Sequence, residues 1–401
     1  MGRAVHVLTN TVQHYDWGSP VAVHELLGTT PDGRPAAELW LGAHPSAPSR
    51  TADGVRLDDL IHDDPVGTLG TRVSDGFGPR LPFLLKVLAA ERALSLQVHP
   101  RPHAARAGFN RENRTGVPLG SPQRSFHDDQ HKPEMVVALT RFEALAGFRS
   151  PRAALRLLQG LDGELVARAA DALARDRSGQ GLRAAFGTLV AARGDAACRE
   201  HVDQAVASVR ARLEAGSPSP VEDATVLLLA QQHPGDPGAV ASLLLNRLTL
   251  EPGRAMFVPP GEVHAYLSGL AVEVMASSDN VLRAGLTTKH VDEPALVECA
   301  SFEPSPPVTP RVAVAGRHSR VVTFRAPVEE FALTAAAVDP AEPAVLPPAG
   351  PRVLLALDGR LELRHAGGTT PLPRGRSVFV PDATGPLEAA GEGRLVCAWV
   401  P

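Results

Sequence analysis

The sequence of 401 residues predicts a mainly β protein in which two jelly-roll units are separated by an inserted all-helical domain. Short apolar runs bounded by turn residues, which are typical of strands, fill the first part of the chain. From about Ser150 to His233 the apolar residues recur at spacings of three and four, which is the helical period. Strand-like runs with Gly and Pro turns then return and continue to the last residue. We therefore expect three units, namely a discontinuous first unit at 1–149 and 236–300, a helical insert at 150–235 and a C-terminal unit at 301–401.

The first unit is expected to be all-β. Its first strands are predicted at the apolar runs AELWLGAH, LPFLLKVLAA and ALSLQVHP. Between about Pro100 and Gln130 the sequence is polar and irregular, which predicts a long loop with one short helix. Strands resume at HKPEMVVAL and, after the insert, near LLLNRLTL. A jelly roll is the expected form, because small antiparallel sandwiches of this kind protect the edges of their sheets.

The insert and the C-terminal unit differ in the period of their apolar residues. Helices are predicted at PRAALRLLQGL, ELVARAADALARD, GLRAAFGTLVAARG and REHVDQAVASVRARLEAG. The insert holds no cluster of His, Cys and carboxylate residues that suggests chemistry, so we expect it to form a lid or a wall. Strands of the C-terminal unit are predicted at VVTFRAPVEEFALTAAAV, RVLLALDGRLELRH, SVFVPDA and RLVCAWV.

Composition and charge exclude several classes of partner. The formal net charge of -4 gives no overall basic field, so nucleic acid is not an expected partner. No apolar run approaches the roughly 20 residues that span a bilayer, and the N-terminal stretch lacks a secretory apolar segment. Three widely spaced cysteines, Cys198, Cys299 and Cys397, suit a reducing compartment. We therefore expect a cytoplasmic monomer that contacts no membrane.

Lysine is rare in this chain. Of the 40 basic residues only Lys86, Lys132 and Lys289 are lysines, which leaves 40 − 3 = 37 arginines. Arginine is a planar fork that keeps its proton near neutral pH, so it cannot replace lysine at every site. Chance survival explains any single lysine, but all three lie in the motif segments described below, as do both tyrosines, Tyr15 and Tyr266. This coincidence favours a functional role.

Two strand segments carry candidate metal ligands. Gln97 and His99 lie two residues apart in ALSLQVHP, so both side chains project from one face of a strand. The segment from Gly253 to Gly269 has the spacing G-x5-P-x-G-x2-H of the second cupin motif, with Ser268 in the place of its final Asn and with His264 delivered by a Pro-Gly turn. A strand histidine alone is more often a hydrogen-bonded wall residue, so neither segment is decisive by itself.

A third segment, HDDQHKPEMVVAL, adds a carboxylate. In the expected strand Lys132 and Glu134 project from one face and His131 from the other. Taken alone, Lys132 and Glu134 are explained by a simple ion pair. Glu134 together with Gln97, His99 and His264 gives two imidazoles, an amide oxygen and a carboxylate. This mixed shell suits zinc best, although manganese, iron or cobalt also fit. Because only the carboxylate is charged, the site keeps a net charge near plus one and stays electrophilic.

A fourth segment, from Gly269 to Asp292, is dense in ionisable side chains. One interpretation is a solvated edge of the sheet, and the other is a site that binds phosphate and sugar hydroxyls. In the second interpretation Arg283 and Lys289 supply cationic donors, whereas Glu273 and Asp279 accept from hydroxyls or position the cations. Asn280 and His290 lie in the same stretch.

The ordered blocks resemble a known family. YDWGS, ELWLGAHPSAPS, LPFLLKVLAAERALSLQVHP, HKPEM, PPGEVHAYLSG and SDNVLRAGLTTKHVD are similar, in this order, to type I mannose-6-phosphate isomerases of the cupin superfamily. Gln130 and Thr288 depart from residues common in that family. The resemblance implies one zinc per chain, a sugar-phosphate substrate and a place in carbohydrate metabolism and GDP-mannose biosynthesis. It assigns zinc binding to Gln97, His99, Glu134 and His264, an essential role to Arg283, and pocket lining to Trp17, Ser95, Lys132, Tyr266, Glu273 and Lys289.

The C-terminal unit carries a degenerate copy of the second motif. The spacing G-x5-P recurs from Gly375 to Pro381, but Ala383 fills the glycine position and Pro386 the histidine position. We therefore expect one catalytic cupin that binds the metal and one structural cupin that does not, as the family resemblance also implies.

The expected reaction interconverts mannose 6-phosphate and fructose 6-phosphate through a cis-enediol(ate), with a proton moved between C1 and C2. A zinc ion of net positive charge would stabilise the negative charge that develops on the two oxygens, and Arg283 would assist or hold the substrate. Lys132, His131 and Glu273 are candidates for the base. Two other classes stay open, an iron-dependent oxygenase and a sugar-sensing protein without catalysis.

Overall fold

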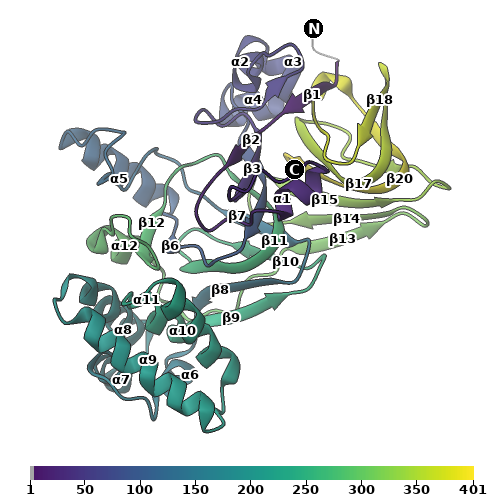
Figure 1. The fold of residues 1–401 in the computed structure, drawn as a ribbon. Helices are drawn as coiled ribbons and strands as arrows, with labels where there is room; N and C mark the ends of the chain where they lie inside the picture. The colour runs from purple at the N-terminus through teal and green to yellow at the C-terminus, as the bar shows by residue number, and fades with distance from the viewer. Residues whose placement is uncertain (1–3) are drawn as a thin grey trace.

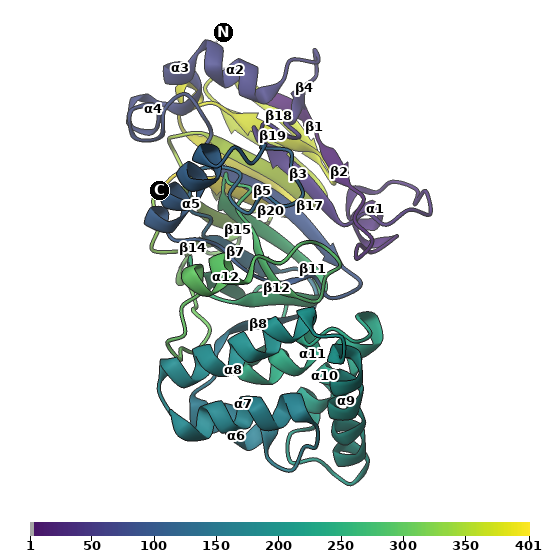
Figure 2. The ribbon, with the colours of Figure 1, turned by 90° about the vertical axis from the view of Figure 1, so that its left-hand side faces the viewer.

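The computed structural model describes residues 4–401 and consists of two antiparallel sheets and a bundle of helices (Figure 1). In both views the helical bundle lies at one end of the molecule, the first sheet lies in the middle, and the sheet of C-terminal strands lies at the other end (Figures 1 and 2). The mainly β fold with a helical insert is therefore confirmed.

The middle sheet is built by segments from both sides of the insert. Its path is β10-β7-β11-β5-β3-β2, and β6, β8, β9 and β12 join it through β11 and its neighbours. Its strands are β2 (Thr11–Gln13), β3 (Glu38–Gly42), β5 (Phe83–Ala90), β6 (Leu96–Val98), β7 (Glu134–Ala138), β8 (Phe142–Phe148), β9 (Leu245–Leu250), β10 (Ala255–Val258), β11 (His264–Ala276) and β12 (Leu282–Gly285).

The second sheet contains the C-terminal strands in the order β13-β14-β15-β20-β17-β19-β1-β4. Its strands are β1 (His6–Thr9), β4 (Arg50–Thr51), β13 (Arg311–Ala315), β14 (Arg320–Arg325), β15 (Ala332–Val338), β16 (Ala344–Val345), β17 (Arg352–His365), β18 (Gly368–Pro373), β19 (Ser377–Val380) and β20 (Leu387–Trp399). Two strands from the start of the chain, β1 and β4, thus pair within the sheet of the C-terminal residues, with Val7 opposite Val378. Sheet membership therefore does not follow the expected separation of residues 1–149 from the C-terminal unit at 301–401, and the division into three units stays a prediction.

Four helices match the segments that the apolar period predicts in the insert, namely α6 (Pro151–Leu158), α7 (Glu164–Arg175), α8 (Gly179–Ala191) and α9 (Cys198–Glu214). The insert also contains the 3-10 turn η1 (Ala192–Gly194) and a fifth helix, α10 (Pro220–Gln232), whereas α11 (Gly238–Ala241) and the 3-10 turn η2 (Ser242–Leu244) follow its expected end at residue 235. Their buried side chains form one apolar cluster with residues of the middle sheet that include Leu96, Leu145 and Leu282. The insert is therefore packed on the sheet as a wall and shares its core.

The expectation that the first hundred residues are all-β is wrong in detail. They also contain α1 (Ala22–Leu27), α2 (Leu57–Asp63), α3 (Pro65–Leu69) and α4 (Thr71–Phe77). Leu57 and Ile61, four residues apart in α2, are both buried on one face of that helix, and Leu69 of α3 and Val73 of α4 are buried as well. The expected short helix after Pro100 is α5 (Pro102–Arg114), and the elements that complete the chain are α12 (Glu293–Cys299) and the turn η3 (Asp382–Thr384).

An apolar core lies between the two sheets. It joins Leu39, Val87 and Val272 of the middle sheet to Phe331 and Val353 of the C-terminal sheet. The two sheets therefore share buried surface, and their packing fixes the position of each against the other. None of the helices in the described part of the chain is long and apolar enough to cross a membrane.

Candidate metal centre and substrate pocket

Three candidate ligands from distant segments meet at one point. His99 follows β6, Glu134 begins β7 and His264 begins β11. Glu134 bridges the two imidazoles, because its Oε1 lies 3.1 Å from His99 Nε2 and its Oε2 lies 3.3 Å from His264 Nε2. All three are buried, and their ligand atoms lie within 4.8 Å of one another, which makes them the one such group of His, Cys, Asp or Glu found among residues 4–401.

Backbone carbonyls set the tautomer of both histidines. Nδ1 of His99 donates to the carbonyl of Asn280 at 2.6 Å, and Nδ1 of His264 donates to the carbonyl of Glu262 at 3.1 Å. Each Nε2 lone pair therefore faces the cluster, as metal ligation requires. Nε2 of His99 is buried without a hydrogen-bond partner, which a bound cation would satisfy.

The protonation states favour a cation as well. Burial lowers the pKa of His99 to about 4, so its imidazole is neutral. Burial acts to raise the pKa of Glu134, but Lys132, whose Nζ lies 2.9 Å from Oε1, holds it well below its usual range. Lys132 and Glu134 therefore contact each other, although Lys132 lies before β7 and not in the strand. Burial acts to lower the pKa of His264, but its hydrogen bond to Glu134 raises it above the usual value. Two imidazoles and a carboxylate form the donor set that zinc prefers.

Gln97 lies beside the cluster with its amide nitrogen turned inward. Its Nε2 lies 3.3 Å from His264 Nε2, and its Oε1 accepts from Ser95 Oγ at 3.3 Å. A half-turn of the amide exchanges two groups of nearly equal size and places the oxygen toward the cluster. Gln97 therefore has the position that its predicted role requires, and the role itself stays a prediction.

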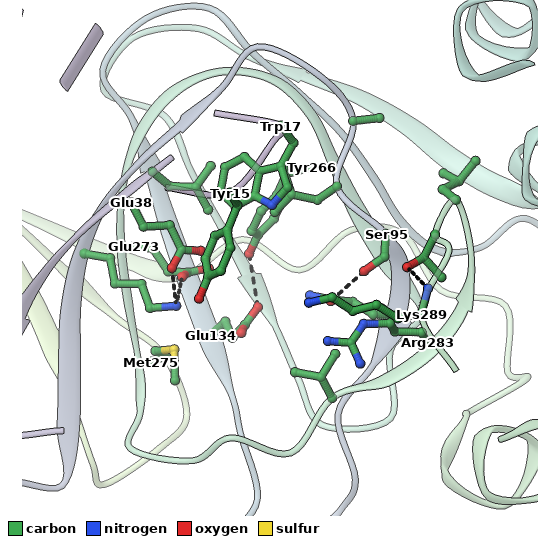
Figure 3. A pocket seen from close by; sticks show the side chains of 18 of the residues that line it. Tyr15, Trp17, Glu38, Ser95, Glu134, Tyr266, Glu273, Met275, Arg283 and Lys289 are labelled. Carbon is green, nitrogen blue, oxygen red and sulfur yellow. Dashed lines mark hydrogen bonds and ion pairs between the residues drawn. The ribbon is translucent and has the colours of Figure 1, made fainter. Parts of the chain in front are cut away.

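A pocket of about 480 Å³ opens beside the cluster (Figure 3). It is lined by most of the residues singled out in the sequence, namely Trp17, Ser95, Gln97, Lys132, Glu134, Tyr266, Glu273, Asp279, Arg283 and Lys289. Arg283 of β12 lies opposite Gln97 of β6, and Lys289 lies 5.9 Å above the ring of Tyr15. Asp279 Oδ1 lies 3.4 Å from Nε2 of the buried His44. Cationic groups and Glu134 of the cluster therefore line one cavity.

One candidate points elsewhere. His131 does not line the pocket, and its Nε2 lies 2.5 Å from Oε1 of Glu330, which precedes β15. In this arrangement the ring that was a candidate for the base contacts the C-terminal sheet.

The sequence interpretation missed a buried ionic network next to the cluster. Lys86 Nζ lies 3.3 Å from Glu38 Oε2 and 3.4 Å from Glu273 Oε2, and Trp40 Nε1 donates to Glu38 at 2.6 Å (Figure 3). The register explains the network, because Lys86 pairs with Trp40 on one side and with Glu273 on the other. The sequence did carry a signal for this network, because a glutamate lies in the apolar run ELWLG and a lysine in the apolar run FLLKVLAA. Buried charges are rarely left unpaired, so each of them predicts a partner of opposite charge.

Glu273 and Tyr266 connect this network to the cluster. Tyr266 is buried and its hydroxyl donates to Glu134 Oε2 at 3.3 Å. Burial, reinforced by the negative charge of Glu134, raises the pKa of Glu273 to about 7. A carboxylate that titrates near neutral pH therefore lies on the wall of the pocket.

The fold and this cluster define a metal-binding protein of the cupin type. A sequence model of the family "Phosphomannose isomerase type I, catalytic domain" matches residues 5–151. The mannose-6-phosphate isomerase of Escherichia coli is 37% identical over 393 residues, covering 97% of each chain, and that of Bos taurus is 37% identical over 76% of this chain and 74% of its own. A crystal structure of mannose 6-phosphate isomerase bound with zinc and yttrium has a TM-score of 0.88 at 36% identity and covers 99% of each chain. The chain belongs to the type I phosphomannose isomerase family.

Proposed function

We propose that this protein interconverts mannose 6-phosphate and fructose 6-phosphate with one zinc ion per chain. The observation that carries the proposal is the buried cluster of His99, Glu134 and His264, whose Glu134 lines a cavity that also holds Arg283 and Lys289. A cytoplasmic monomer that serves GDP-mannose synthesis and binds neither nucleic acid nor membrane is the setting we infer for it.

The residues present fit the zinc ion. His99 and His264 would bind it through Nε2, Glu134 through a carboxylate oxygen, and Gln97 through its amide oxygen after the half-turn described above. When bound, the ion supplies Lewis-acid stabilisation of the negative charge that develops on the O1 and O2 oxygens of the sugar. Because Lys132 contacts Glu134 Oε1, it would share that carboxylate with the metal.

The cations of the pocket suit a phosphate and a polar sugar. Within residues 4–401 neither Arg283 nor Lys289 forms an ion pair with a carboxylate of the chain, and burial lowers the pKa of both. Arg283 is partly buried and Lys289 is exposed, and cations that line a cavity without a carboxylate partner favour an anionic ligand. The aromatic pair of Tyr15 and Trp17, stacked at 5.7 Å, provides an apolar wall beside them.

Proton transfer requires a base on one face of the substrate. Glu273 and Lys132 both line the cavity, and a pKa of about 7 for Glu273 suits a group that must accept and return a proton near neutral pH. His131, the third candidate, is turned toward Glu330. The geometry therefore favours Glu273 or Lys132 as the base.

A coupled assay tests the proposal directly. Purified protein is supplied with mannose 6-phosphate, fructose 6-phosphate is detected through a coupling enzyme, and bound metal is measured on the same sample. We expect turnover with close to one zinc per chain. Absence of turnover in zinc-loaded protein would contradict the proposal.

A further inference from the structure

A side-chain contact joins the segment that carries Lys132 and Glu134 to the C-terminal sheet. His131 Nε2 donates to Glu330 Oε1 at 2.5 Å, across 199 residues of sequence. Glu330 lies in the connection between β14 and β15, and the side chains of His131 and Glu330 are 23% and 16% exposed. The pair is thus largely removed from solvent, where such contacts contribute more than at the surface.

The position of Glu330 is fixed by its surroundings. The next residue, Phe331, is fully buried in the core between the sheets, and this core also contains Met135, which follows Glu134. Burial acts to raise the pKa of Glu330, but the hydrogen bond from His131 and the backbone N–H groups of Glu329 and Glu330 lower it below its usual value. The carboxylate is therefore held ionised by the imidazole and by the backbone around it.

The other contacts of the segment come from the middle sheet and its loops. The side chain of Asn280 accepts from the backbone of His127 at 2.7 Å and donates to the carbonyl of Gln130 at 2.8 Å. Further along, the N–H of Ala276 donates to the carbonyl of Pro133 at 3.1 Å. Between these two anchor points lie His131 and Lys132, and the side chain of His131 is held by Glu330.

We propose that Glu330 is a positioning residue, which acts through His131 to fix the Lys132–Glu134 segment at the cavity. This inference rests on the proposed isomerase function and extends it, because the sheet that carries no candidate metal ligand then takes part in catalysis. His131 serves as the anchor of the segment, and the proton is carried by another group. Loss of the anchor misplaces Lys132, which costs turnover more than binding because Arg283 and Lys289 are untouched.

The test compares variants of the full-length, zinc-loaded protein. We expect Glu330→Ala to lower kcat about 10-fold with KM within about twofold, since a small misplacement of a reacting group carries such a cost. Glu330→Gln keeps an acceptor oxygen for Nε2–H and should retain activity within about threefold of the wild type. Glu329→Ala is the matched control, because Glu329 is an exposed neighbour of the same type, and it should behave as the wild type.

A double-mutant cycle separates an anchor from a proton carrier. His131→Ala should lower kcat about as much as Glu330→Ala, and the double variant should lose no more than either single variant. The inference is overturned if the kcat of Glu330→Ala equals that of Glu329→Ala. It is also overturned if His131→Ala abolishes turnover while Glu330→Ala retains it.

Hydrogen exchange provides a readout that does not depend on activity. Backbone amides of residues 127–134 should exchange about tenfold faster in Glu330→Ala than in Glu329→Ala, because an anchor of the segment is lost. Unchanged exchange contradicts the inference even if kcat falls. A wild-type protein that fails to isomerise mannose 6-phosphate would defeat the proposed function instead, while the exchange comparison would still decide whether Glu330 orders the segment.

Discussion

At the scale of single residues, the site is defined by atoms whose bonding is incomplete without a ligand. His99 Nε2 is buried without a hydrogen-bond partner, and Arg283 and Lys289 face the cavity without a carboxylate. These groups were recognisable in the sequence because His99 lies two residues from Gln97 in a strand pattern, and because Arg283 and Lys289 lie in one segment dense in ionisable side chains. Glu38 and His44 were not, because their partners Lys86 and Asp279 are set by strand register and loop position far along the chain.

Replacement of Arg283 tests the cationic side of the cavity. We expect Arg283→Ala to lower kcat about 100-fold or more, because a partly buried charge that stabilises a developing anion is removed. Zinc content should not change, since Arg283 contacts none of the predicted ligands through its side chain in the structure described here. The kcat of Arg283→Lys, which keeps the positive charge but loses the planar guanidinium, should lie between the kcat of the wild type and that of Arg283→Ala. Full turnover in the alanine variant would remove Arg283 from the mechanism.

Glu262 predicts a pH dependence of stability. Burial raises its pKa from the usual 4.5 to about 7, so the folded state keeps a proton between these values that the unfolded state has already lost. The contribution of Glu262 to stability should therefore fall as the pH rises from 4.5 to 7, by at most about 3 kcal/mol, and stay level above 7. Glu262→Gln should show a correspondingly smaller fall, and the part that remains belongs to groups such as Glu273, whose pKa is also raised to about 7. Denaturant unfolding of both proteins between pH 5 and 8 measures it, and parallel curves would show that the assigned shift is wrong.

At the scale of elements, the strands were easier to predict than the connections between them. β3, β5 and β6 lie within the predicted apolar runs, and α6 to α9 follow the three- and four-residue period. The helices α2 to α4 were missed because each offers only one or two turns of periodic sequence, too little to distinguish a helix from broken strands. The pairing of β1 with β19 was also beyond reach, because nothing local in either strand identifies its partner.

The loop before β7 depends on one buried amide. Asn280 is fully buried, its side chain bonds to the backbone of residues 127–130, and its carbonyl orients His99. We expect Asn280→Ala to reduce stability by about 2–4 kcal/mol, since several buried hydrogen bonds lose a partner. Zinc should also dissociate at least about tenfold faster, because a support of the ligands is lost. Stopped-flow chelation measures this rate, with the exposed Asn110→Ala as a control. An unchanged rate would limit Asn280 to a role in stability.

At the scale of the whole molecule, the two sheets share one buried core. The core between them takes Leu39 and Val272 from one sheet and Phe331 and Val353 from the other, and the N-terminal strand β1 lies in the C-terminal sheet. The C-terminal sheet therefore buries apolar surface that the middle sheet would otherwise expose.

Truncation tests this dependence. A chain that ends at residue 300 loses β13 to β20 and exposes the apolar face of the middle sheet, so we expect it to aggregate or to bind a hydrophobic dye without a cooperative unfolding transition. Expression, light scattering and thermal unfolding against the full chain provide the comparison. A soluble fragment with cooperative unfolding would show that the middle sheet folds alone.

The most direct test of the account is the removal and return of zinc. Protein stripped with a chelator and verified as metal-free should not convert mannose 6-phosphate, and one equivalent of zinc should restore turnover, because His99, Glu134 and His264 converge on one site. The same cycle with Glu134→Ala should restore nothing. Undiminished isomerisation by verified metal-free protein would contradict the account.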